Sequence, residues 1–323
     1  MRKAVLTSFL ADDIEAYISH KLSLGFVFDE GRRALVSFDA MCTSDFPDEV
    51  ELTREVAMKW AGLRDGEHPN TRRGRVSAVR GLAEYMIRQG KPAYVIPRNS
   101  LSPATPYVPY IYTRGEIAAL LEACDALAGG ARPGECKLML PCAIKLLYAT
   151  GMRHGELRRL GRSDVDLGRG EISIGPSKTT LGRTVYISDE LCELLERFDG
   201  DAEKAAPGRA YLFSRRDGGM RSKSWLQPHF AAAKCVAGID EPGVAKRIHD
   251  LRHTFCVHRL NQWVHDGEDV RAMLPYLSAY VGHKTLAATD YYLHLVPEFF
   301  PDYSALVAHR NSVVPEIGGE ADE

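Results

Sequence analysis

Long apolar runs, paired cysteines and metal-binding motifs are all missing from this sequence. Apolar residues make up 45% of its 323 residues, yet they form no run of about 18, so we expect no membrane-spanning helix. Seven cysteines occur without any CxxC pair, which argues against a disulfide framework or a zinc ribbon and fits a reducing cytoplasm. No HExxH motif occurs among the histidines, and we expect no metal ion and no other cofactor. Asp12 and Asp13 precede any long apolar run, so we expect no signal peptide.

An excess of basic charge, which is common in proteins that bind nucleic acids, is also missing. Lys and Arg number 41 against 43 Asp and Glu, for a net charge of −2. Residues 67–98 nevertheless hold seven Lys or Arg against two Glu, and residues 204–223 hold six against one Asp. Such local runs bind phosphates even when acidic stretches elsewhere cancel the total, although either run alone is more typical of a solvated face. If these runs bind nucleic acid, the candidate contacts are Arg72, Arg73, Arg75, Arg80, Arg215 and Arg216.

Five prolines fall within residues 92–112 and divide the chain into two parts. Proline fixes φ, removes a hydrogen-bond donor and drives the preceding residue into extended geometry, so this segment is predicted to be a semi-rigid linker. Its four tyrosines indicate that parts of it pack against a domain. We expect a small N-terminal domain over residues 1–91, a larger domain over residues 113–314 and an acidic tail over residues 315–323.

Apolar spacing predicts a mainly helical protein with one small antiparallel sheet. Before the linker, helices are predicted over residues 10–22, 32–42, 50–63 and 71–88. After it, they are predicted over residues 114–127, 134–149, 154–160, 189–197, 225–236, 250–261, 268–281, 285–293 and 298–309. Thr113 and Glu116 form a capping box. Between Glu171 and Ile187 the apolar residues alternate around a Gly/Pro/Ser turn, which predicts a β-hairpin.

Three segments carry polar residues at defined spacing beside glycine or leucine. The first two contain arginine and histidine, and the third contains histidine and tyrosine. They are ATGMRHGEL at residues 149–157, HDLRHT at residues 249–254 and VGHKTLAATDYYLH at residues 281–294. Each segment alone is modest evidence for a function. Their order, their separation and their internal spacing are together a strong indication.

In these segments the chain resembles the tyrosine recombinase (phage integrase) family. That family shows a Thr-Gly-x-Arg-x-x-Glu-Leu box, a lysine in a β-hairpin, a His-x-x-Arg box, a Gly-His box and a tyrosine nine residues after that histidine. The matching positions here are Arg153, Lys178, His249, Arg252, His283 and Tyr292. The resemblance spans roughly residues 113–306 by motif order, and the N-terminal part matches only as a small helical domain in the expected place.

The resemblance implies that Tyr292 attacks a DNA phosphodiester, forming a 3′-phosphotyrosine bond and releasing a 5′ hydroxyl. This bond stores the phosphodiester energy, so rejoining requires no nucleotide cofactor. Charge grows on the non-bridging phosphate oxygens during the attack. Arg153 and Arg252 are assigned to bind these oxygens, because arginine stays protonated at any working pH and binds phosphate bidentately.

Proton transfer falls to the remaining residues of the set. A tyrosine hydroxyl has an ordinary pKa of about 10 and needs help to lose its proton, for which His249 is the candidate base. Lys178, the only lysine of the predicted hairpin, is the candidate donor to the leaving 5′ oxygen. His283 is expected to donate a hydrogen bond to a non-bridging oxygen. Supporting roles around the site are expected for Glu156, Asp250 and His294.

The resemblance also implies how the protein assembles. It predicts a C-shaped clamp on double-stranded DNA, a homo-tetramer on two specific recombination sites, and cutting by half of the subunits at a time. The segment of residues 298–314 is expected to dock on a neighbouring subunit. Accessory DNA-bending proteins or a partner recombinase are further candidate partners, and the expected location is the cytoplasm, on nucleoid DNA.

Alternatives stay open at this point. A regulator that kept the fold but lost cutting is opposed by the complete catalytic set. A metal-dependent nuclease built on His249 and Asp250 would be sensitive to EDTA. A Xer-like resolvase shares the chemistry, although the near-neutral charge and the distinctive N-terminal half slightly favour a recombinase of a phage, transposon or integrative element.

Some neighbouring residues have two interpretations. Tyr291 is the rival nucleophile, but adjacent helical residues point about 100° apart, so the spacing favours Tyr292 and Tyr291 is expected to pack. His253 is interpreted as a structural or surface residue. Trp225 is either a core residue or a DNA contact. Arg183, the other base of the hairpin, is a candidate phosphate ligand but a poor proton donor.

Overall fold

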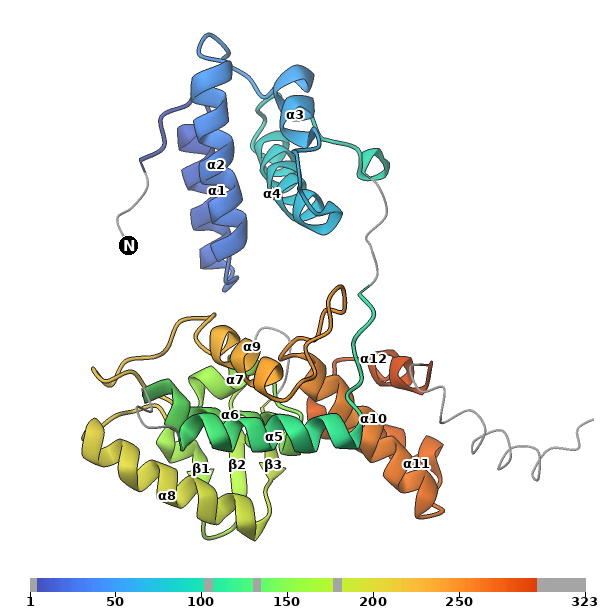
Figure 1. The fold of residues 1–323 in the computed structure, drawn as a ribbon. Coiled ribbons are helices and arrows are strands. Elements are labelled where there is room, and N and C mark those ends of the chain that lie inside the picture. Colours follow the sequence, from blue (N-terminus) through green and yellow to red (C-terminus); the bar gives the residue numbers. More distant parts are fainter. Residues whose placement is uncertain (1–4, 102–106, 130–134, 177–181, 295–323) are drawn as a thin grey trace, which may run out of the picture. The chain divides into compact units, whose positions relative to one another are not determined.

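The computed structural model describes residues 5–101, 107–129, 135–176 and 182–294. The chain divides into two compact units, Met1–Val108 and Pro109–Glu323 (Figure 1). The division lies inside the proline-rich segment from which the sequence predicts a linker. Among the described residues, no helix has both the length and the apolar composition needed to cross a bilayer.

The first unit is a bundle of four helices. They are α1 (Ala11–Ser23), α2 (Asp29–Asp45), α3 (Arg54–Ala61) and α4 (Pro69–Arg88). Helix α4 contacts each of the other three, and the Trp60 ring meets Phe38 edge to face in the core, with centroids 5.2 Å apart. Pro69 begins α4, where its missing N–H costs nothing, and Gly90 follows the helix with a φ of 79°. The four helices predicted from the sequence are confirmed, with shifted ends.

The chain that follows α4 packs against this bundle. Ala93 pairs with Leu52 in a short parallel bridge, and Ile96 and Leu101 are buried in the same core. Arg80 Nε donates to Ile96 O at 2.7 Å, and a 3-10 turn, η1, covers Arg98–Ser100. The first part of the proline-rich segment is therefore held by apolar burial and by a side-chain hydrogen bond.

The second unit holds the remaining described helices around a larger core. They are α5 (Arg114–Ala128), α6 (Glu135–Thr150), α7 (His154–Arg159), α8 (Asp189–Ala205), α9 (Gln227–Val236), α10 (Asp250–His265), α11 (Val270–Val281) and α12 (Ala287–Asp290), with 3-10 turns η2 (Arg162–Asp164) and η3 (Tyr291–His294). Helix α6 is central, since it contacts α5, α7, α8, α9 and α10. Thr113 caps α5 in the predicted capping box with Glu116. Trp225 is 7% exposed and stacks on Phe213, so it is a core residue.

A three-stranded antiparallel sheet in the order β1-β2-β3 completes this unit. Its strands are β1 (Val165–Asp166), β2 (Glu171–Ile174) and β3 (Arg183–Tyr186). Ile172 pairs with Val185, and both side chains are buried because alternate residues of each strand face the core. The predicted hairpin is confirmed, whereas β1 is too short to show a period in the sequence. Lys178 and the predicted helix 298–309 lie outside the described residues.

Candidate active site

The turn between α6 and α7 positions Arg153. Gly151 has a φ of 61°, and a Cβ there would lie 2.5 Å from Phe255 Cδ1, so glycine is needed for both reasons. Arg153 follows in extended geometry as the N-cap of α7. Its backbone N–H donates to Glu156 Oε2 at 2.8 Å and its Nη1 to Glu156 Oε1 at 3.0 Å. Glu156 therefore fixes both the turn and the direction of the guanidinium.

Arg252 lies in the first turn of α10 with only 2% of its surface exposed. Its Nη1 donates to Gly151 O at 2.8 Å and its Nη2 to Val281 O at 2.6 Å. Burial, together with the charge of Arg153, lowers the pKa of Arg252 to about 10. Arg252 therefore stays protonated at neutral pH in a place where a bound phosphate would stabilise it.

The end of α11 brings His283 to the same place. Gly282 takes a left-handed φ of 70°, which lets the backbone N–H of His283 bond Ser278 O at 2.9 Å, as in a glycine C-cap. The His283 Nδ1 lies 2.8 Å from Thr289 Oγ1, which orients the ring. Gly282 O also accepts from Arg153 Nη2 at 3.5 Å, so the two arginines are held by neighbouring carbonyls.

Tyr292 is buried against this cluster, with 2% of its surface exposed. Its hydroxyl lies 3.1 Å from His253 Nδ1, and its ring stacks on His283 with centroids 5.8 Å apart. Burial raises the pKa of Tyr292 above its ordinary value, the Cys256 thiol adds to this, and Arg252 opposes it. Without DNA the phenol is therefore protonated. Tyr291 is 39% exposed and its ring meets that of Tyr292 with centroids 6.3 Å apart, so it packs only in part.

His249 at the N-cap of α10 and His253 one turn later lie side by side, and His253 contacts Tyr292. The rings of His249 and His253 meet edge to face at 4.9 Å. Burial and the nearby Arg252 and Arg153 lower the pKa of His249 to about 4, and burial with His249 and Arg252 lowers that of His253 to about 3. Both imidazoles are neutral at pH 7 and can accept a proton.

The imidazole that contacts the phenol is that of His253, which the sequence had suggested to be structural or on the surface. The signal that could have identified it is its i+4 spacing from His249, since this spacing places both side chains on one helix face. His249 itself is the N-cap of α10. Asp250 is fully buried and accepts the backbone N–H of Arg247 at 2.7 Å, so it holds the turn that presents His249.

Glu156 is shared by two arginines. Besides Arg153, Arg183 donates from Nη1 to Oε1 at 3.1 Å and from Nη2 to Oε2 at 2.8 Å. Although burial alone would raise it, the pKa of Glu156 is held at about 2 by Arg183 and Arg153. This internal pairing leaves Arg183 poorly placed for the phosphate contact that the sequence had suggested. The side chain of His294 and all of Lys178 lie outside what the structure describes.

Within residues 5–101, 107–129, 135–176 and 182–294, no group of three or more His, Cys, Asp or Glu side chains could hold a metal ion.

Arg75 is not available to DNA, contrary to its choice as a candidate contact. It is 7% exposed, its Nε and Nη2 donate to the two carboxylate oxygens of Glu67 at 2.6 and 2.7 Å, and its other hydrogen bonds go to Trp60 O and Gly62 O. Arg72 is partly committed as well, since its Nε donates to Ala61 O at 2.7 Å. These arginines tie α4 to α3 and the loop after it.

The basic run of residues 204–223 is likewise only partly on the surface. Arg209 and Arg221 are 4% and 7% exposed. Arg209 pairs with Asp199 and Glu203, and Arg221 lies over the Trp225 ring at 5.3 Å. Arg215 and Arg216 are exposed, and Arg215 pairs with Asp217. Counting charges in the sequence therefore overstates the basic surface here.

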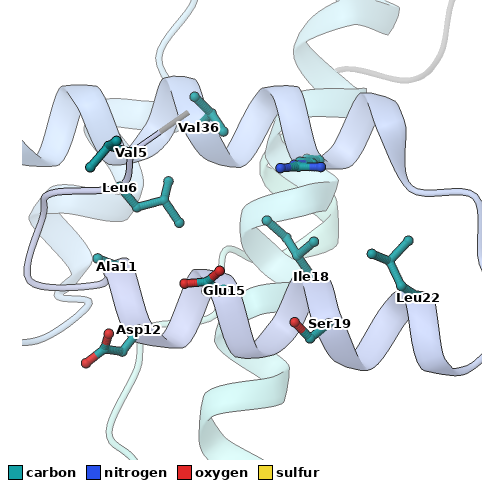
Figure 2. Close-up of a pocket in the computed structure, with 10 residues that line it drawn as sticks. Val5, Leu6, Ala11, Asp12, Glu15, Ile18, Ser19, Leu22 and Val36 are labelled. Atoms are coloured by element: carbon teal, nitrogen blue, oxygen red, sulfur yellow. The ribbon is translucent and has the colours of Figure 1, made fainter. Parts of the chain in front are cut away.

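Two hollows of the first unit differ in charge. The one between α1 and α2 measures about 410 Å³ and is lined mostly by apolar side chains, with two carboxylates, Asp12 and Glu15, and one cation, Arg32 (Figure 2). The other measures about 610 Å³, and the basic residues that line it are Lys21, Arg73, Arg80 and Arg98. The same hollow holds Gly74, Ser77 and Gly81 of α4 and one carboxylate, Glu84. Only the second hollow has the charge to receive a phosphate.

Comparisons with known proteins point to one family. The sequence model of the phage integrase family matches residues 112–298. The protein y4rE of Sinorhizobium fredii (strain NBRC 101917 / NGR234), named as an integrase/recombinase, is 33% identical over 293 residues, which cover 88% of this chain and 91% of that protein. Tyrosine recombinase XerD of Vibrio vulnificus (strain YJ016) is 30% identical over 244 residues, or 73% of each chain.

Solved structures share the fold. XerH recombinase bound to its difH substrate matches with a TM-score of 0.65 and 19% identity, over 91% of this chain and 83% of that one. The Tn1549 transposon integrase in complex with circular intermediate DNA matches with a TM-score of 0.64 and 18% identity, over 93% and 99%. Together, the family match and the relatives show that this chain belongs to the phage integrase family of tyrosine recombinases, the enzymes that cleave and rejoin DNA.

Proposed function

We propose that the protein is a site-specific recombinase that cuts and rejoins DNA strands through a 3′-phosphotyrosine bond at Tyr292. The observation that carries this proposal is the location of the Tyr292 hydroxyl, which is buried beside His253 and close to Arg252. Tyr291, the adjacent phenol, is far more exposed, at 39% against 2% for Tyr292.

The arginines supply the charge for the phosphate. Arg153 makes two side-chain hydrogen bonds among the described residues, and a guanidinium has five N–H donors. In the hydrogen bonds given above, Arg252 donates only to backbone carbonyls. A carbonyl carries no full negative charge, so the charge of Arg252 is not neutralised by them. Arg153, Arg183 and Arg252 thus face one carboxylate, Glu156, and the excess positive charge fits an anionic phosphodiester whose charge grows in the transition state.

The phenol needs a base because its pKa is raised by burial. We assign the first proton transfer to His253, whose Nδ1 lies within hydrogen-bond distance of the hydroxyl. His249 lies beside His253 and remains the candidate base if DNA binding shifts the phenol toward it. Lys178 is proposed as the proton donor to the leaving 5′ oxygen, and His283 as a hydrogen-bond donor to a non-bridging oxygen.

Duplex DNA is the proposed substrate, and the first unit is proposed to bind its backbone through the basic hollow. Lys21, Arg73, Arg80 and Arg98 line it, and Gly74 of α4 has open space where a side chain would lie, which leaves room for a strand to approach. Exposed Arg215 and Arg216 are candidate contacts on the second unit. Such contacts give affinity and register, while the recombination site itself is read through base edges.

The biological role that fits best is recombination of a mobile element, with a homo-tetramer as the active assembly. The proposal draws support from the likeness to the Tn1549 transposon integrase and to a lambda integrase tetramer bound to a Holliday junction, with a TM-score of 0.60. A Xer-like resolvase is the second candidate, and its support is the XerD similarity over 73% of the chain. The docking of residues 298–314 on a neighbour belongs to the same proposal.

The test is covalent capture on a nicked duplex that carries the element's own end sequence, in EDTA. Wild-type protein should become attached to the 3′ phosphate, Tyr292→Phe should give no adduct, and Tyr291→Phe should retain it. His253→Gln and His249→Gln, assayed in the same way, identify the base by the larger loss of rate. Tight binding of that DNA without an adduct would instead favour a non-cutting regulator, and an adduct that requires a metal would contradict the mechanism.

A further inference from the structure

Arg183 joins three segments of the active site through one buried guanidinium. It begins β3, and its side chain is 7% exposed. Its two Nη atoms bind both carboxylate oxygens of Glu156, while its Nε donates to Tyr280 O at 2.8 Å. All three of these contacts are internal, so Arg183 acts on the site through other residues.

Consecutive carbonyls at the end of α11 hold three arginines. Tyr280 O accepts from Arg183, Val281 O from Arg252, and Gly282 O from Arg153. The carbonyl end of a helix carries partial negative charge, which favours cations. The three guanidiniums are thereby fixed relative to one another by a single helix end, and Arg183 is part of the frame that orients the other two.

Glu156 is the second element of this frame. A fork-to-fork pair with Arg183 at 2.8 and 3.1 Å is a strong, directional ion pair. Arg153 binds the same carboxylate through one side-chain bond of 3.0 Å. With Arg183 holding Glu156, Arg153 is fixed by this bond yet keeps other N–H donors for a ligand.

We propose that Arg183 is a positioning residue for DNA cleavage. It occupies Glu156, so that Arg153 remains directed at the scissile phosphate, and it anchors β3 to the end of α11. Because Lys178 precedes it by five residues in the sequence, the same anchor fixes the strand that follows the candidate proton donor. This inference rests on the proposed function, since it concerns the same reaction.

Removing Arg183 should slow the chemical step and leave DNA binding nearly unchanged. In Arg183→Gln, Glu156 would lose the fork that holds it and would shift, and Arg153, which it fixes through one side-chain bond, would shift with it. A displacement of about 1 Å costs on the order of 10²-fold in rate. We expect that loss in single-turnover adduct formation at saturating DNA, with less than about a threefold change in Kd. Arg183→Lys should recover only part of the rate, because lysine cannot reproduce the fork.

A pH profile separates this role from simple support of the fold. The charged and titratable groups facing Glu156 are Arg183, Arg153, Arg252 and His249, and the pKa of Glu156 is held at about 2. Without Arg183, the buried carboxyl should take up a proton at a higher pH and release Arg153. The acid limb of the cleavage rate should therefore move to higher pH, whereas a loss of folded protein would lower the rate at every pH.

Glu156→Gln provides the decisive background. Arg183 lowers the pKa of His283 as well as that of Glu156. Its removal could therefore shift the acid limb of the pH profile through either group. If Glu156 carries the effect, the shift caused by Arg183→Gln should vanish when Glu156→Gln is already present. A shift that persists unchanged in the double variant would overturn the role assigned to Glu156.

Arg209→Gln is the matched control. Arg209 is as buried as Arg183 and also pairs with carboxylates, Asp199 and Glu203, but it has no contact with the cluster in the pairs given above. The Arg209→Gln variant should have a lower melting temperature. Its cleavage rate per folded molecule and the position of its acid limb should be those of the wild type. An active wild type with an equally fast Arg183→Gln, or with an unmoved acid limb, would overturn the positioning role alone. A wild type that forms no adduct would overturn the proposed function, and this inference with it.

Discussion

The two units of this protein each contain a buried arginine–glutamate pair, and the pairs differ in how much charge is left over. In the first unit, Glu67 meets Arg75, whose other donors are taken by backbone carbonyls. In the second, Glu156 is shared by Arg153 and Arg183, while Arg252 is held by carbonyls nearby. In the first pair the two charges cancel, whereas the second cluster keeps positive charge and, at Arg153, N–H donors beyond its two side-chain bonds.

We infer from this difference that a buried arginine indicates a ligand site only when two conditions hold. Its charge is not cancelled by its internal partners, and they leave some of its N–H donors unused. Backbone carbonyls orient a guanidinium without neutralising it, so Arg252 is held in one direction and keeps its charge. A carboxylate that pairs with one arginine alone, as Glu67 does with Arg75, neutralises that arginine and leaves no net charge for a ligand. Substitutions at the two pairs should therefore have different effects. Those at Glu156 and its arginines should slow the reaction, and those at Arg75 and Glu67 should lower the stability of the fold.

Arg153→Gln should cause the largest effect, about a 10³-fold loss in the rate of adduct formation, because it removes a preorganised cation from the growing phosphate charge. Its free energy of unfolding should change little, since the side chain is 29% exposed. The rate is measured in single turnover at saturating nicked DNA, and stability by urea unfolding. Arg162→Gln is the control, because Arg162 is 34% exposed and pairs with Asp199 outside the site. Equal losses in both variants would contradict the comparison.

Arg75→Gln should mainly destabilise the first unit, by about 3–5 kcal/mol, because it leaves Glu67 buried without its partner. Arg75 lowers the pKa of Glu67, so the pair contributes stability above the pKa of the unfolded carboxyl and loses it as pH falls through the folded pKa. The gap between wild type and variant should therefore narrow on acidification, as measured by urea unfolding from pH 7 to pH 3. Arg72→Gln, which breaks a bond to a carbonyl only, should cost about 1 kcal/mol.

Much of the second unit was predictable because its motifs carry local physics. Gly151 and Gly282 both take left-handed backbone conformations, and each presents the arginine or histidine that follows, so spacing along the chain predicts the position of the side chains. The hairpin was visible as a change of period between Glu171 and Ile187. By contrast, β1 has two residues and contains no period to detect.

The sequence could not assign Arg75, Arg183 or His253, because their roles depend on partners distant along the chain. Arg75 and Arg73 lie on one basic helix turn, and only packing against α3 decides that the first is consumed internally. Arg183 meets Glu156 across 27 residues and Tyr280 across 97. His253 meets Tyr292 across 39 residues. The contacts of Arg75 and Arg183 leave no period or spacing in a single sequence, and for His253 the only sequence signal is its i+4 spacing from His249.

Arg73→Gln should produce the smallest effect and tests whether the basic hollow is the surface that binds DNA. Each phosphate contact adds about one unit to the slope of log affinity against log salt, so removing one should lower that slope by about one. The binding constant for a duplex, measured by fluorescence anisotropy between roughly 50 and 200 mM salt, gives the slope directly. Arg32→Gln is the matched control, because Arg32 lies at the hollow that Asp12 and Glu15 also line.

The outcome at Arg73 sharpens the rule drawn from the two pairs. Arg73 lies two residues before Arg75 on α4 but lines the hollow beside Lys21, Arg80 and Arg98, where cations outnumber the one carboxylate, Glu84. If excess charge marks a ligand site, Arg73→Gln should lower the slope while Arg32→Gln does not. A lower slope in Arg32→Gln instead would place the DNA-binding face at α1 and α2. In that case the excess of cations in the hollow would have no bearing on DNA binding.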